Sequence, residues 1–157
     1  MRATQPEGGS QSDARQEALP SRCREALGRW GEEHIRAHLI SRGYEIEAAR
    51  WARAPLGELD LVAAKGPLLC FVEVRTRLCP PRGVKNWVEP AESVSLRKQR
   101  RLARTAEAYL LARRGARRDY LRFDVAALWA LRLHGEGGYE PASLHYIEDA
   151  FQVPWAF

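Results

Sequence analysis

Two short apolar segments that contain charged residues constrain the fold of this chain more than any other feature. They are GELDLVAA, residues 57–64, and LLCFVEVRTR, residues 68–77. The Lys-Gly-Pro turn between them, together with their branched and aromatic residues, predicts a β-hairpin of two buried strands. Because charged side chains are rarely buried without a partner, the three carboxylates and two guanidinium groups in these segments require a specific role.

Alternation along the two strands brings the charged residues together. Glu58 and Asp60 share one face of the first strand, and Glu73 and Arg75 share one face of the second. If the strands pair antiparallel about the turn, Asp60 comes opposite roughly residues 72–73. Two carboxylates this close repel each other unless a cation or a proton lies between them, and Mg²⁺ prefers oxygen ligands. The pattern therefore predicts a divalent-metal site, and a structural ion pair with Arg75 is the alternative.

Periodicity elsewhere predicts the remaining elements. A helix is expected over residues 22–42, ended by Gly43, and a second helix from Ser93 or Ser95 to Arg114. Further strands are expected over residues 44–48, 120–131 and 143–151. The resulting order, α-β-β-β-α-β-β, predicts an α/β or α+β domain with a mixed sheet.

The first helix carries two residues of special interest. Gly31 lies within its apolar stripe, which predicts a close approach to a sheet. At about 100° per residue, Glu32 falls on the edge of that stripe, whereas Glu33 points to solvent.

Composition limits the class of protein. Residues 1–21 predict a disordered polar tail, and residues 22–157 are long enough for one domain with a real core. The chain has neither a run of about 18 apolar residues nor the apolar region of a secretory signal at its N-terminus. Its three cysteines lack the paired spacing of a zinc site. We therefore expect a cytoplasmic protein that does not bind membranes.

Positive charge is concentrated in the second helix and just beyond it. Ten basic residues and two acidic ones lie between Arg97 and Arg122, whereas the net charge of the whole chain is only +5. One face of the helix carries Arg97, Arg100, Arg101 and Arg104. Arginine suits bidentate phosphate contact, so we expect nucleic acid as the partner; a solvated helix face is the alternative.

Five blocks of the sequence occur in an order shared with a known family. They are GRWGEEHIRAHLISRGYEI, GELDLVA, FVEVRTR, VSLRKQRRLARTAEAYL and RFDVAAL. In these blocks the chain resembles the YraN-like family of small bacterial proteins, which are similar to the PD-(D/E)xK nucleases and Holliday-junction resolvases. The resemblance implies a restriction-endonuclease-like fold, in which helices flank a mixed central sheet with a metal site on one edge.

The resemblance also implies roles for individual residues. Asp60 corresponds to the first aspartate of the nuclease motif, Glu73 to its second acid and Arg75 to its basic residue, while Glu32 corresponds to an additional acid on the first helix. Asp60, Glu73, the Val74 carbonyl group and Glu32 would hold Mg²⁺ or Mn²⁺. The implied reaction is hydrolysis of a phosphodiester bond, most simply in structured or branched DNA. Because resolvase-like relatives act as dimers, a homodimer is compatible with this resemblance.

Two positions depart from the nuclease motif. Leu59 precedes Asp60 where the motif has proline, and Arg75 replaces its lysine. Arginine stays protonated and clamps phosphate oxygens, so it is poorly suited to handling the proton of a water molecule. Lys98, on the inward side of the second helix, is a candidate replacement. The alternative, which we favour, is that its stem lies along the core and its amine reaches solvent beside the nucleic-acid-binding arginines.

Three functions follow from these patterns. A metal-dependent endonuclease needs both the carboxylates and the arginines. A catalytically silent nucleic-acid-binding module on a nuclease fold needs only the arginines, and the loss of the motif lysine favours it. A domain whose arginine face binds an acidic protein is the third.

Overall fold

The order of secondary structure agrees with the sequence prediction. A computed structural model describes residues 20–80, 94–115, 118–133 and 137–153. Its elements are α1 (Ser21–Ser41), β1 (Glu45–Arg53), β2 (Gly57–Lys65), β3 (Leu68–Leu78), α2 (Leu96–Ala112), β4 (Tyr120–Arg132) and β5 (Tyr139–Phe151). Residues 1–19 of the predicted polar tail lie outside the described ranges.

The five strands form one mixed sheet in the order β1-β2-β3-β4-β5. β3 and β4 run parallel, and the other neighbouring pairs are antiparallel. α2 lies between β3 and β4 in the chain, as expected for the long connection that parallel neighbours require. The predicted α/β architecture, a mixed central sheet flanked by helices, is confirmed.

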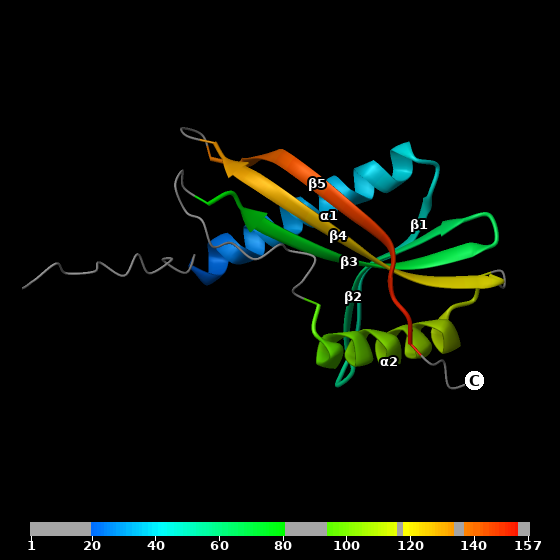
Figure 1. Cartoon of the computed structure of the whole chain (residues 1–157). Coiled ribbons are helices and arrows are strands. Elements are labelled where there is room, and N and C mark those ends of the chain that lie inside the picture. Colours follow the sequence, from blue (N-terminus) through cyan, green and yellow to red (C-terminus); the bar gives the residue numbers. More distant parts are fainter. Residues whose placement is uncertain (1–19, 81–93, 116–117, 134–136, 154–157) are drawn as a thin grey trace, which may run out of the picture.

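The two helices cover opposite faces of the sheet (Figure 1). Alternate residues of β3 separate two apolar clusters, because Leu69 and Phe71 belong to the cluster under α2, whereas Cys70 and Val72 belong to the cluster under α1. The inward stripes of the helices include Leu27, Ile35 and Leu39 in α1 and Leu102, Ala106 and Tyr109 in α2. This two-sided core holds β3 rigidly in the middle of the sheet.

Glycine and a cap residue position the helices. A Cβ atom at Gly31 would collide with the side chain of Thr76 on β3, so the predicted close approach of α1 to the sheet is confirmed. Gly43 follows α1 with a φ of 82°, a conformation that favours glycine after a helix. The Ser95 side chain accepts a hydrogen bond from the Lys98 N–H at 3.3 Å, which identifies Ser95 as the residue that caps α2.

Three element ends differ from the prediction by two residues or more. β1 extends to Arg53 because it pairs with β2 as far as Gly57, and β5 begins already at Tyr139. Pro141 within β5 is tolerated because β5 is an edge strand. α2 ends at Ala112, two residues earlier than predicted. Neither of the helices described combines the length and the apolar composition that a bilayer crossing requires.

Candidate functional site

β2 and β3 separate at the two acidic residues that the sequence places opposite each other. Their ladder ends where Leu61 pairs with Val72, and the same register brings Asp60 opposite Glu73, as predicted. There the Asp60 Oδ2 atom accepts a hydrogen bond from the Val74 N–H at 2.8 Å. The Asp60 carboxylate therefore replaces a backbone carbonyl as the hydrogen-bond partner of β3 at the point where the β2–β3 ladder ends.

The backbone bends at the same place. Arg50 of β1 lies across from Asp60 and has a φ of 51°, a left-handed conformation that is uncommon for such a residue. In β2, Leu59 packs in the α2 cluster and Leu61 in the α1 cluster, although residues two apart on a straight strand share a face. This local twist lets side chains from both faces of the sheet approach Asp60.

Glu73 is buried, but only one of its oxygens has a partner. Its side chain is 3% exposed, and its Oε1 atom lies 3.0 Å from Lys98 Nζ and 3.6 Å from Arg75 Nη1. The Oε2 atom is buried without a hydrogen-bond partner in the described part of the chain. Because an unsatisfied carboxylate oxygen is costly in a protein interior, a bound cation or a proton donor is the missing partner that we expect.

The interpretation that we favoured for Lys98 is wrong. Its amine does not end among the solvent-facing arginines but contacts the Glu73 carboxylate, and its side chain is only 22% exposed. Ser95 begins α2 and thereby places Lys98 in the first turn, on the side that faces β3. α2 therefore places a lysine next to Glu73, in addition to Arg75 of β3.

Burial and a neighbouring charge strongly perturb the Asp60 carboxyl group. Burial, reinforced by the charge of Glu73, raises the pKa of Asp60 to about 7, against the opposing effects of the Val74 N–H and Lys98. A divalent ion would replace the proton that Asp60 retains and would satisfy the Oε2 atom of Glu73. The two side chains therefore fit Mg²⁺ or Mn²⁺, which prefer oxygen ligands.

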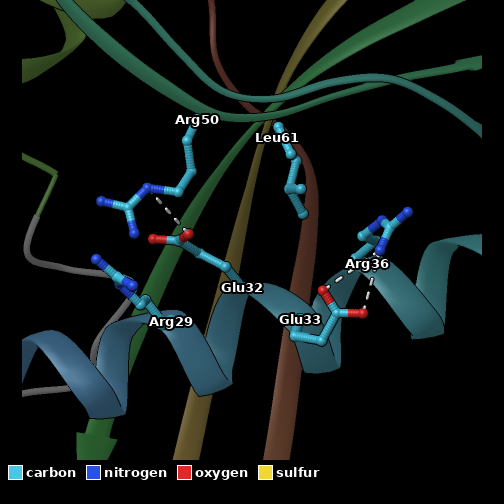
Figure 2. Close-up of a pocket in the computed structure, with 7 residues that line it drawn as sticks. Arg29, Glu32, Glu33, Arg36, Arg50 and Leu61 are labelled. Atoms are coloured by element: carbon cyan, nitrogen blue, oxygen red, sulfur yellow. Dashed lines mark hydrogen bonds and ion pairs between the residues drawn. The ribbon is translucent and has the colours of Figure 1, made fainter.

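Glu32 approaches this pair from α1, but an arginine holds it. Its carboxylate lies 3.9 Å from Arg50 Nε (Figure 2), and Glu58 lies 3.4 Å from the same atom. Burial raises the pKa of Glu32, and Arg50 partly offsets this rise. Within the residues described, no three His, Cys, Asp or Glu side chains are grouped closely enough to hold a metal ion. Glu32 is therefore near the Asp60–Glu73 pair without completing a three-carboxylate site.

The arginines predicted to bind nucleic acid form an exposed face of α2. They are Arg97, Arg100, Arg101 and Arg104. Lys98 lies on the same turn of the helix and contacts Glu73, and the Arg101 side chain lies against Gly57 at the start of β2. The basic face is therefore at the end of α2 that borders the carboxylates.

Sequence reasoning missed Arg50. Its role depends on the bend of β1 and on the position of Glu32, and no local pattern in the sequence encodes either. It also missed Glu47, whose two oxygens bind Arg113 at 2.6 and 2.8 Å and Arg118 at 3.1 Å. Because this carboxylate is fully paired and ties the end of α2 to β1, we interpret it as structural.

Comparison with known proteins agrees with the resemblance noted in the sequence. The model of "Uncharacterised protein family UPF0102" matches residues 31–128. A UPF0102 protein of Desulfitobacterium hafniense is 40% identical over 121 residues, covering 77% of this chain and 93% of the relative. A UPF0102 protein of Syntrophotalea carbinolica is 44% identical over 128 residues, covering 82% and 93%. Another from Synechococcus is 39% identical over 137 residues, covering 86% and 97%. The YraN-like resemblance is thus confirmed, and the chain belongs to the UPF0102 family.

Proposed function

We propose that this protein is a metal-dependent endonuclease that hydrolyses phosphodiester bonds in structured or branched DNA. The observation that carries the proposal is the buried pair of Asp60 and Glu73, in which one Glu73 oxygen has no hydrogen-bond partner among the described residues and a lysine contacts the other. A purely structural carboxylate has both oxygens bonded, as Glu47 does with its arginines. The contrast favours a site that receives a ligand.

Asp60 and Glu73 would hold Mg²⁺ or Mn²⁺, with the carbonyl group of Val74 as a further oxygen ligand. When bound, the ion supplies Lewis-acid activation of a water molecule and of the phosphate. The Val74 N–H fixes the orientation of the Asp60 carboxylate, as hydrogen bonds to metal ligands commonly do. Glu32 would add a ligand when Arg50 releases it.

In this proposal Lys98 and Arg75 share the role that the lysine has in the PD-(D/E)xK motif. Lys98 Nζ lies against the buried oxygen of Glu73, where its compact charge can orient the carboxylate and donate to a water or a phosphate oxygen. Arg75 contacts the same oxygen from β3 and, always protonated, can stabilise negative charge on the phosphate. Two side chains from different elements thus flank one carboxylate.

The exposed arginines of α2 would bind the backbone that flanks the cleaved bond. Contacts of this kind fix the position of the nucleic acid but carry no sequence information. We therefore expect recognition of shape or branching, with an affinity that falls steeply as salt rises.

A nucleic-acid-binding module without catalysis is the second candidate. Two observations favour it: arginine stands at the position of the motif lysine, and Glu32 is paired with Arg50. This candidate predicts DNA binding through α2 that is independent of Asp60 and Glu73.

Cleavage assays separate the two candidates. Branched, single-stranded and duplex DNA and an RNA hairpin would be incubated with Mg²⁺ or Mn²⁺ and with wild type, Asp60→Asn, Glu73→Gln or the control Glu140→Gln, which changes an exposed carboxylate of β5. We expect wild type and the control to cleave, and both site variants to lose about 100-fold or more. If no substrate is cut while DNA binding in EDTA is the same for all four proteins, the binding module is the better description.

A further inference from the structure

We propose that a pocket on the α1 side of the carboxylates binds a phosphate group of the nucleic-acid strand. The inference rests on the proposed function and adds to it a second phosphate-binding surface, separate from α2. The pocket has a volume of about 520 Å³. Its lining includes Arg29, Glu32, Glu33, Arg36, Arg50 and Leu61 (Figure 2).

Three guanidinium groups from two elements line this pocket. Arg29 and Arg36 are seven residues apart on α1, so they lie on the same face two turns from each other. Arg50 enters from β1, at the position where the left-handed backbone bends the strand. Figure 2 shows the guanidinium groups of Arg29 and Arg50 turned toward the Glu32 carboxylate. Two planar guanidinium groups that converge in this way suit the tetrahedral oxygens of a phosphate, while Arg36 is turned toward Glu33 in the same view.

The present partners of these arginines are easily exchanged. Arg29 pairs with Glu25, and Arg36 pairs with Glu33, through side chains that are 45–70% exposed; exposed helical pairs of this kind contribute little to stability. The contacts of Arg50, at 3.4 and 3.9 Å, are longer than the about 2.7–2.9 Å of a strong charge-assisted hydrogen bond. A phosphate can therefore recruit these groups without disrupting the core.

Glu32 connects the pocket to the carboxylate pair. It lines the pocket and lies 3.9 Å from Arg50 Nε, and its charge contributes to the raised pKa of Asp60. A phosphate bound by Arg50 would separate that arginine from Glu32. Occupation of the pocket and the availability of the Glu32 carboxylate are thereby linked.

The test measures DNA binding in EDTA, so it does not depend on cleavage. The double variant Arg29→Ala/Arg36→Ala removes two pocket charges at exposed positions. The double variant Arg24→Ala/Arg42→Ala is the matched control, because it also removes two exposed arginines. Arg24 lies on another face of α1, and Arg42 directly follows the last residue of α1. The probe is a labelled 12-nucleotide single strand with or without a 5′-phosphate, and fluorescence anisotropy is recorded over a range of salt concentrations.

We expect the pocket variant to bind at least about fivefold more weakly than the control, and its salt slope to fall by about 0.7, since each neutralised phosphate of a single strand contributes about 0.7. A loss confined to the phosphorylated strand identifies a terminal phosphate, whereas an equal loss on both strands identifies an internal phosphodiester. Equal binding by the two double variants, or no binding by wild type, would overturn the proposal.

The outcomes also separate this proposal from the endonuclease itself. If wild type cleaves DNA and the two double variants bind DNA equally, the phosphate pocket is refuted but the endonuclease is not. A selective binding loss without any cleavage by wild type would refute the endonuclease and leave the phosphate pocket in place.

Discussion

Replacing Asp60 with asparagine should stabilise this protein at alkaline pH when no divalent ion is present. In the wild type, burial and the charge of Glu73 raise the pKa of Asp60 from 3.8 to about 7. A carboxyl group whose pKa is raised by folding contributes its stability fully below the unfolded pKa and loses it as the pH rises through the folded pKa. Asparagine retains an oxygen that can accept the Val74 N–H bond but carries no charge.

The magnitude follows from the two pKa values of Asp60. Each tenfold change in proton affinity corresponds to about 1.4 kcal/mol. A rise from 3.8 to about 7 therefore removes about 4 kcal/mol of folding free energy between pH 4 and pH 8. Over this range, the difference in unfolding free energy between Asp60→Asn and wild type should shift by about this amount in favour of the variant.

Urea unfolding in EDTA at pH 4, 6 and 8 measures this shift. Glu140→Gln, at an exposed position of β5, is the control. Adding Mn²⁺ at pH 8 should stabilise wild type more than Asp60→Asn. A difference between Asp60→Asn and wild type that stays constant from pH 4 to pH 8 would show that folding does not raise the pKa of Asp60.

Three further predictions concern neighbouring parts of the molecule. Lys98→Met should destabilise the fold by about 3 kcal/mol, because it leaves a buried carboxylate with only the longer contact to Arg75. Lys98→Arg should recover part of this loss in urea unfolding, and equal stability of all three proteins would contradict the ion pair. Gly31→Ala should cost about 2 kcal/mol through its collision with Thr76, and adding Thr76→Ala should restore most of the stability. Arg100→Ala combined with Arg104→Ala should lower the salt slope of duplex-DNA binding by about 1.8, and an unchanged slope would exclude this face of α2 from the contact.

Local patterns were sufficient for the fold and for the centre of the site. The turn over residues 65–67 and the two-residue period of the strands determine the register, so Asp60 could be placed opposite Glu73 before the structure was known. The helical period likewise separated Glu32, which is half-buried, from Glu33, which is exposed.

Other parts of the site depend on tertiary placement. A helical wheel puts Lys98 on the inward side of α2, but only the distance between α2 and β3 decides whether its amine meets Glu73 or solvent. The position of Arg50 depends on a left-handed backbone conformation in the middle of a strand. Arginine does not favour this conformation, and the neighbouring residues do not predict it. For the same reason, the sequence could not show that Glu32 is paired with Arg50.

The most direct test of the proposed metal site is a calorimetric titration with Mn²⁺ at neutral pH. We expect binding to wild type and to the exposed-site control Glu140→Gln, and loss of binding in both Asp60→Asn and Glu73→Gln. Absence of binding to wild type, or binding that both site variants retain, would contradict a metal site at these carboxylates.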